Sequence, residues 1–220
     1  MPFQLAIAVA HGTLSLNDAL ERMARKDKVV RLMERHNLSQ ALANQVAIGH
    51  ADLEHILVGQ RFDAHRLANR DRSILVSGDQ AVVLVCHGGR QVEGRIVAVE
   101  PYLVLLSPKG GGESEAIHKL QIKYAYSAAE WKRVKKSARG DRRSSEAVSP
   151  VIRPQDRYTC SDRRLFGYVD RRVEVVVTLL EGDQVRGIVT WFGRYEFGLQ
   201  LKSEAEIVVF RHALEHIGPA

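Results

Sequence analysis

The chain has few cysteines and no long apolar run, which argues against several protein classes. Its only cysteines among 220 residues, Cys86 and Cys160, lie far apart without a CxxC or Cys/His ligand spacing, which argues against a disulfide framework and a structural zinc site. The longest apolar runs, 5–10 and 81–86, are much shorter than the ~20 residues that span a bilayer. A signal peptide usually carries a Lys or Arg before its apolar run, and none precedes the first run here. We therefore expect a cytoplasmic protein that does not bind membranes.

Acidic residues are scarce in one part of the chain. Residues 131–172 contain thirteen Lys or Arg and five Asp or Glu, and the net charge of the whole chain is +6. A basic balance favours polyanionic partners such as nucleic acid. Apolar periodicity is absent in the middle of this window, which predicts a flexible linker over 127–161. Its candidate phosphate contacts are Lys132, Arg133, Lys135, Lys136, Arg139, Arg142 and Arg143.

Residues 1–70 are predicted to form a helical module. Apolar residues recur every three or four positions over 15–36, and the spacing of Ser15 and Asp18 is that of a capping box at a helix start. Ser39 is a suitable N-cap for a second helix that Gly49 would end, and a third follows over 51–67. Three such helices with one apolar face each can form a small bundle.

The pattern after residue 73 is that of short β-strands separated by turns. β-Branched residues predominate over 74–126 and again over 174–217. Residues 83–106 and 176–199 share seven identities in 24 positions at a constant offset of 93, which indicates an internal repeat. Gly94 and Gly187 are equivalent glycines inside strands, where they predict a sharp bend. Beyond this stretch a shift to 94 pairs His118 with His212.

Three stretches of the second repeat carry a family resemblance. LLEGDQVRG, WFGRYEFGLQL and VVFRHALEHI together resemble the Sm-like RNA chaperone Hfq over residues 162–217, and the third stretch is the most specific. The first repeat, 74–126, is similar in pattern only. The resemblance predicts an α+β chain: the helical module, then two strongly bent antiparallel sheets of the small-barrel, Sm-like kind.

The resemblance also implies a uridine site in the second repeat. In the family, an aromatic residue at the central turn and a basic–His pair form it; here these are Tyr195 with Arg194, and Arg211 with His212. Stacking on tyrosine and hydrogen bonds from Arg and His suit a single-stranded RNA base. The family's basic rim corresponds to Arg171, Arg172, Arg163 and Arg164.

In the first repeat Tyr102 and His118 correspond to parts of this site. Pro101 and Ile117 replace the flanking polar and basic positions, so we expect weaker binding there. The opposite, adenine-reading face departs from the family at Thr178, Asp183 and Arg186.

The family assembles six Sm folds into a ring by strand pairing. With two repeats in each chain, the resemblance implies a homo-oligomer of three chains, a pseudo-hexameric trimer. The predicted function is binding of uridine-rich single-stranded RNA for post-transcriptional regulation.

Two alternatives remain open from the sequence. Residues 38–57 have the rhythm of a helix-turn-helix, so the helices could contact DNA while the repeats only oligomerise, although Asp52 and Glu54 make the candidate recognition helix acidic. The repeats could also build a purely structural ring. Independently of these alternatives, the N-terminal helices could bind a protein partner. No nucleophile–base–orienter set, metal-ligand set or cofactor motif stands out, so we do not expect an enzyme.

Overall fold

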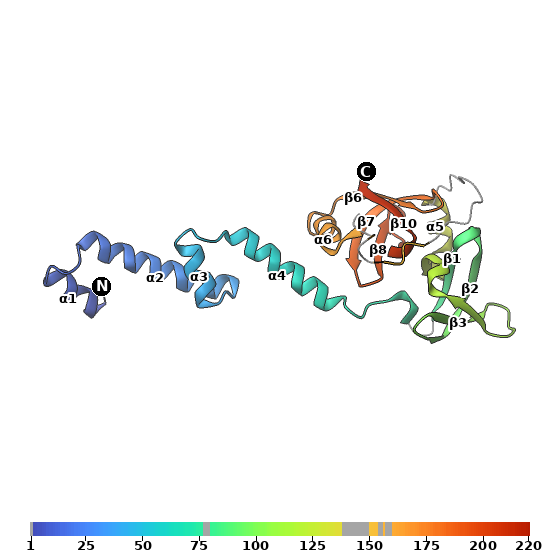
Figure 1. The fold of residues 1–220 in the computed structure, drawn as a ribbon, viewed down its shortest axis with the longest axis horizontal. Coiled ribbons are helices and arrows are strands. Elements are labelled where there is room, and N and C mark those ends of the chain that lie inside the picture. The colour runs from blue at the N-terminus through green and yellow to red at the C-terminus, as the bar shows by residue number, and fades with distance from the viewer. Residues whose placement is uncertain (1, 77–79, 138–149, 154–155, 157–159) are drawn as a thin grey trace. The chain divides into compact units, whose positions relative to one another are not determined.

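A computed structural model describes residues 2–76, 80–137, 150–153, 156 and 160–220 (Figure 1). The chain divides into two compact units, here called the helical unit (1–63) and the sheet unit (64–220). Among the described residues, no helix is long and apolar enough to cross a membrane. Arg139, Arg142 and Arg143 of the predicted linker lie outside the described residues.

Serine side chains cap the starts of two helices in the N-terminal part of the chain. Helix α1 spans Phe3–Ala10, α2 Leu16–His36, α3 Gln40–Ala47 and α4 Leu53–Ala68. The Ser15 side chain accepts a hydrogen bond from Asp18 N, and Ser39 accepts one from Leu42 N, which confirms both predicted N-caps. Helix α2 ends at Asn37, whose φ of 49° is left-handed. Helix α1 was not among the helices expected from the sequence.

The core of the helical unit lies between α2 and α3. Val29 and Leu32 of α2 pack against Ala43 and Val46 of α3, and Leu38 in the connection completes the cluster. Leu53 and Ile56 at the start of α4 pack against it while staying partly buried. The core of this unit is therefore an α2–α3 pair that the first turn of α4 contacts, and none of the residues of α4 is buried.

The sheet unit contains one ten-stranded antiparallel sheet. The strands follow in the order β10-β6-β7-β8-β9-β5-β1-β2-β3-β4. Their bounds are β1 Ala81–Cys86, β2 Gln91–Val99, β3 Leu103–Pro108, β4 Glu115–His118, β5 Ile122–Ser127, β6 Glu174–Leu179, β7 Gln184–Phe192, β8 Glu196–Leu201, β9 Glu206–Phe210 and β10 Leu214–Pro219. The α+β class with N-terminal helices and a large antiparallel sheet agrees with the sequence.

The sheet consists of two five-stranded repeats with the same strand order. The first repeat (β1–β5) runs β5-β1-β2-β3-β4, and the second repeat (β6–β10) runs β10-β6-β7-β8-β9. Val82 pairs with Gly94 and Val175 with Gly187, which is the offset of 93 in both partners. A Cβ on Gly94 or Gly187 would collide with the backbone carbonyl of the strand beside it, at Ser107 or Gln200. The two halves of the sheet thus share one strand order and register, and each strand glycine lies where the neighbouring strand comes too close for a side chain; the sharp bend expected at these glycines stays a prediction.

The two repeats are joined edge to edge. Strand β9 of the second repeat pairs with β5 of the first, with Tyr124 opposite Val209 and Tyr126 opposite Ile207. The Phe210 side chain belongs to the core cluster of the first repeat, together with Val104 and Ile122. The sequence led us to expect two sheets, but this pairing satisfies one edge of each repeat and joins them into one.

The repeat alignment changes after β3, in the direction opposite to the one expected. His118 lies opposite Leu103 as Phe210 lies opposite Glu196, so the offset there is 92 and His118 corresponds to Phe210. Lys119, not Ile117, takes the place of Arg211. The reason is that the β3–β4 loop is longer than the β8–β9 loop, which reduces the offset.

Part of the stretch predicted as a linker is folded. A 3₁₀ turn covers Ala128–Glu130 and helix α5 covers Trp131–Ser137, followed after the undescribed residues by α6, Asp162–Arg171. Val134 of α5 is buried, which gives this helix an apolar contact. Charge composition alone gave no sign of that one apolar contact.

Candidate nucleic-acid interface

The turn between β7 and β8 exposes an aromatic side chain beside a cation. Tyr195 is 58% exposed, and the guanidinium carbon of Arg194 lies 5.1 Å from the centre of its ring. Gly193 N donates to Glu196 O across 2.8 Å and closes the turn. An exposed ring with a guanidinium next to it can stack on a base while the cation approaches a phosphate.

The first repeat presents an aromatic residue at the equivalent turn. Tyr102 is 73% exposed and its ring stacks on that of His118, with centroids 6.4 Å apart. Lys119 N donates to Tyr102 O at 2.8 Å, as Arg211 N donates to Tyr195 O at 2.9 Å. The two tyrosines are therefore held by the same backbone contact. His118 accompanies Tyr102 as expected, but from a position that corresponds to Phe210 rather than to His212.

The side chain of Arg211 is turned into the protein. It is only 6% exposed, and its guanidinium donates to Cys160 O, Gly193 O and the Asp162 carboxylate at 3.2, 2.6 and 2.8 Å. These contacts tie the β7–β8 turn to the start of α6. The structure thus does not place the Arg211 guanidinium on the surface with Tyr195 and Arg194.

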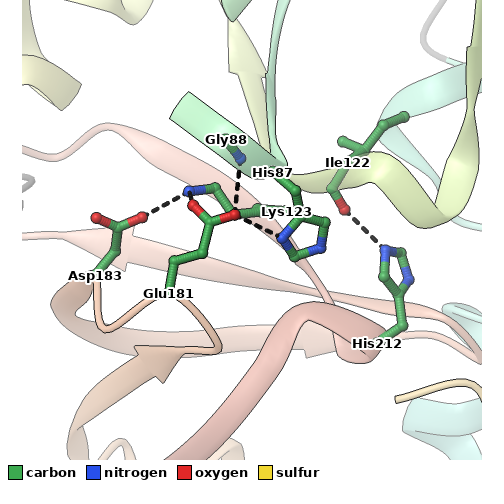
Figure 2. A network of polar contacts seen from close by, with 7 residues as sticks. All are labelled: His87, Gly88, Ile122, Lys123, Glu181, Asp183 and His212. Atoms are coloured by element: carbon green, nitrogen blue, oxygen red, sulfur yellow. Dashed lines mark hydrogen bonds and ion pairs between the residues drawn. The ribbon is translucent and has the colours of Figure 1, made fainter. Parts of the chain in front are cut away.

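His212 lies in the junction between the repeats. Its Nε2 is 2.9 Å from the carbonyl oxygen of Ile122, the first residue of β5 (Figure 2). The residue is 5% exposed. In this position the imidazole links the end of β9 to the neighbouring repeat rather than facing solvent.

A buried ionic network crosses the same junction (Figure 2). Lys123 of β5 donates to Glu181 and Asp183, which lie in the turn between β6 and β7, at 2.6 and 2.7 Å. Glu181 also accepts from Gly88 N at 2.8 Å and lies 3.0 Å from His87 Nδ1. The Lys123 side chain is only 2% exposed, so its charge depends on these carboxylates for compensation.

The network shifts the pKa values of its members in opposite directions. Burial by itself raises the pKa of Glu181, but hydrogen bonds from Lys123 and Gly88 hold that pKa below its ordinary value. Burial lowers the pKa of Lys123, and the bonds to Asp183 and Glu181 outweigh it and raise that pKa. Both groups are therefore charged at neutral pH. The sequence analysis missed this network, although a lysine inside the apolar strand 122–127 was a usable signal.

Basic side chains gather on two helices of the sheet unit. On α6 and at its end, Arg163, Arg171 and Arg172 are exposed, and Arg164 is half-buried with its Nε 2.9 Å from the hydroxyl of Tyr168. On α5, Lys132, Arg133 and Lys135 are exposed, and Lys135 Nζ lies 5.1 Å from the centre of the Trp131 ring. Lys136 also belongs to α5. These helices carry cations that can reach phosphates.

Other chemistry is not evident in the described part of the chain. Among the residues that the structure describes, no three His, Cys, Asp or Glu side chains are grouped so that they could hold a metal ion. Cys86 and Cys160 are both buried thiols. Of the residues on the expected adenine-reading face, Asp183 is engaged by Lys123.

Comparison with known proteins finds similar chains among solved structures. No model of a known protein family matches the chain, and no curated protein matches it. A crystal structure described as that of the pleiotropic translational regulator Hfq is similar at 23% identity and a TM-score of 0.25, over 26% of this chain and 92% of that chain. An identity and a TM-score this low do not establish a family for the chain.

Proposed function

We propose that this chain binds single-stranded RNA and acts in post-transcriptional regulation. The observation that carries the proposal is the pair of exposed tyrosines at equivalent turns, Tyr102 and Tyr195, each with a cationic or imidazole side chain beside it. Single-stranded RNA is bound by such stacking surfaces together with basic side chains, whereas duplex is read in its grooves. The RNA is rich in uridine in this proposal, since the sequence of the second repeat resembles the Hfq-type uridine site.

The roles within the site follow the geometry. Tyr195 provides the stacking face and Arg194 the adjacent cation, while exposed arginines on α6 contact phosphates. Arg211 and His212 position the turn and the junction from inside the protein. Tyr102 and His118 form a second, weaker site. Lys132, Arg133 and Lys135 on α5 add phosphate contacts without base preference.

Assembly into a ring of three chains is part of the proposal. Strands β4 and β10 end the sheet that the described residues form, and such edge strands can pair with other chains. The second repeat already pairs with the first through β9 and β5, and the same relation is available between β4 of one chain and β10 of another. Three chains of two repeats each give six repeats, which is the number of Sm folds in the ring of the Hfq family that the sequence resembles.

Fluorescence anisotropy with labelled six-nucleotide uridine, adenine and deoxythymidine probes tests the RNA assignment. Base–aromatic stacking is worth ~1–3 kcal/mol, so Tyr195→Ala should weaken uridine binding by about tenfold or more. Tyr195→Phe keeps the ring and should bind nearly as wild type. Tyr102→Ala should have a smaller effect, because the neighbour of that ring is the imidazole of His118 rather than a guanidinium.

The probes also separate the alternatives. Equal loss on uridine and adenine probes with Tyr195→Ala would remove uridine preference. A labelled DNA duplex is measured beside them, and tighter binding of this duplex than of both RNA probes would overturn the RNA assignment and favour the DNA-binding alternative. We find no observation that favours it, since Asp52 caps the start of α4 and Glu54 pairs with Arg61 there.

A further inference from the structure

The junction inside the chain shows how the ends of the sheet would meet. Strands β10 and β4 end the described sheet, and each corresponds to a strand used in the internal junction: β10 to β5, and β4 to β9. Tyr124 pairs with Val209 in that junction. At the offset of 92, the same register places His216 of β10 in one copy opposite Ile117 of β4 in another.

One position of this junction carries opposite charges in the two repeats. Lys123 is the residue skipped in the pairing of β5 with β1, between Tyr124 opposite Val85 and Ile122 opposite Cys86. Glu215 is skipped in the same way in the pairing of β10 with β6, between His216 and Leu214. The two residues are thus structurally equivalent, and a lysine in the internal junction corresponds to a glutamate at the free edge.

The residue that faces this position is also exchanged. Asp183, which binds Lys123 at 2.7 Å, lies in the β6–β7 turn, and its carbonyl accepts from Leu179 N across 2.8 Å. In the β1–β2 turn the carbonyl of Arg90 accepts from Cys86 N, also across 2.8 Å. Arg90 therefore stands where Asp183 stands. The second acid, Glu181, corresponds to Gly88 and has no charged equivalent.

We propose that Arg90 of one chain pairs with Glu215 of a second copy where β4 meets β10. Compared with the internal Lys123–Asp183 pair, the strand then carries the negative charge and the turn carries the positive charge. The inference rests on the ring assembly of the proposed function. Glu215 is exposed in the single chain, as expected for a residue whose partner is on another chain. The Arg90 side chain is 55% exposed and contacts Glu115, the first residue of β4, so it already lies at this edge.

The exchange selects between possible assemblies. If the free edge β4 approached β5 of another chain, Arg90 would face Lys123; if β9 approached β10, Asp183 and Glu181 would face Glu215. Both arrangements bring like charges together, which disfavours pairing of a repeat with its own kind. The attractive arrangement alternates first and second repeats around the ring. Because each chain contributes one first repeat and one second repeat, a closed ring of alternating repeats contains equal numbers of both.

Charge reversal tests the pair in the full-length protein. Wild type should have a mass three times 24.6 kDa by light scattering at micromolar concentration. Arg90→Glu and Glu215→Arg should each weaken the trimer, raising its dissociation constant by about tenfold or more, because like charges then meet at the edge. The combination of both changes restores opposite charges and should restore the trimer. Arg95→Glu, the same change on exposed Arg95 of β2, is the matched control.

Disulfide formation tests the register separately. Ile117→Cys combined with His216→Cys should form a disulfide between chains on oxidation, seen as trimers on a non-reducing gel. Ala116→Cys with His216→Cys should not, because neighbouring residues of a strand point to opposite faces.

The outcomes distinguish the two proposals. A wild-type chain that stays at 24.6 kDa overturns the ring and the pair together. A wild-type trimer that both single reversals leave intact, or that the double reversal fails to restore, overturns the Arg90–Glu215 pair alone. A trimer in which the Ile117→Cys, His216→Cys variant forms no disulfide between chains overturns the register. RNA binding by Tyr195 is measured independently of all three.

Discussion

Arg211 holds both ends of the turn that exposes Tyr195. Its backbone N–H donates to Tyr195 O at 2.9 Å, and its guanidinium donates to Gly193 O at 2.6 Å. The same guanidinium reaches Asp162 at the start of α6. One residue thus holds the turn of the exposed tyrosine, through its backbone at Tyr195 and through its buried side chain at Gly193. The residue that positions the site therefore differs from the residues that are proposed to touch the ligand.

This separation predicts different effects for two arginines. Arg211→Met removes hydrogen bonds from two carbonyl groups and a carboxylate, so it should lower the free energy of unfolding by about 2–4 kcal/mol. Arg194→Met, at an exposed position, should change it by about 0.5 kcal/mol or less. Urea denaturation followed by circular dichroism measures both. Equal stability of the two variants would contradict the positioning role of Arg211.

The arginines of α6 predict a salt dependence of RNA binding. If Arg163, Arg171 and Arg172 each contact a phosphate of single-stranded RNA, they contribute about −2 to the slope of log affinity against log salt. Replacing the first two by Gln and Arg172 by Asn should remove that part of the slope. Asn is chosen because Arg172 has a left-handed φ of 50°.

The control for the salt measurement uses the helical unit. Arg22, Arg25 and Lys26 are exposed cations of α2, and their replacement by Gln removes the same charge. The slope should stay as in wild type. If both triple variants changed the slope equally, net charge rather than α6 would determine binding.

Local chemistry explains what the sequence predicted well. Ser15 and Ser39 cap helices through contacts within three residues, so spacing alone locates them. The aligned repeats single out Gly94 and Gly187 because the same collision with a backbone carbonyl excludes a side chain at both positions. These features depend on neighbours that the sequence itself specifies.

The orientation of Arg211 and His212 could not be predicted in the same way. A motif that resembles a uridine site places them at the end of a strand, where they could face solvent. Their burial depends on Cys160, Asp162 and Ile122, which come from segments far away in the sequence. Likewise the Lys123–Glu181 contact appears only once the two repeats pair through β9 and β5.

The strand glycines predict a steric effect on stability. Gly187→Ala places a methyl group against the carbonyl of Gln200, and Gly94→Ala places one against that of Ser107. Each change should cost about 2 kcal/mol or more, since a backbone carbonyl in a paired strand cannot move aside freely. Gly167→Ala is the control, because a methyl there meets only the flexible end of Arg171 and alanine favours the helix. Urea denaturation should show the control at or above wild-type stability; a loss as large as that of Gly187→Ala would contradict the steric explanation.

Glu196 predicts a pH dependence of folding. The residue is 4% exposed, and burial raises the pKa of its carboxyl to about 7, while Ser73 and Lys119 lower it only in part. The folded state therefore keeps a proton that the unfolded state has released, so stability falls as the pH rises from the ordinary carboxyl pKa to about 7. Glu196→Gln has no proton to lose. Relative to this variant, wild type should lose on the order of 3 kcal/mol between about pH 4 and pH 8. Urea denaturation across that range measures this difference. The control variant Glu100→Gln, at an exposed position, should keep the pH dependence of wild type. A constant difference between wild type and Glu196→Gln would show that the Glu196 carboxyl titrates alike in the folded and unfolded chain.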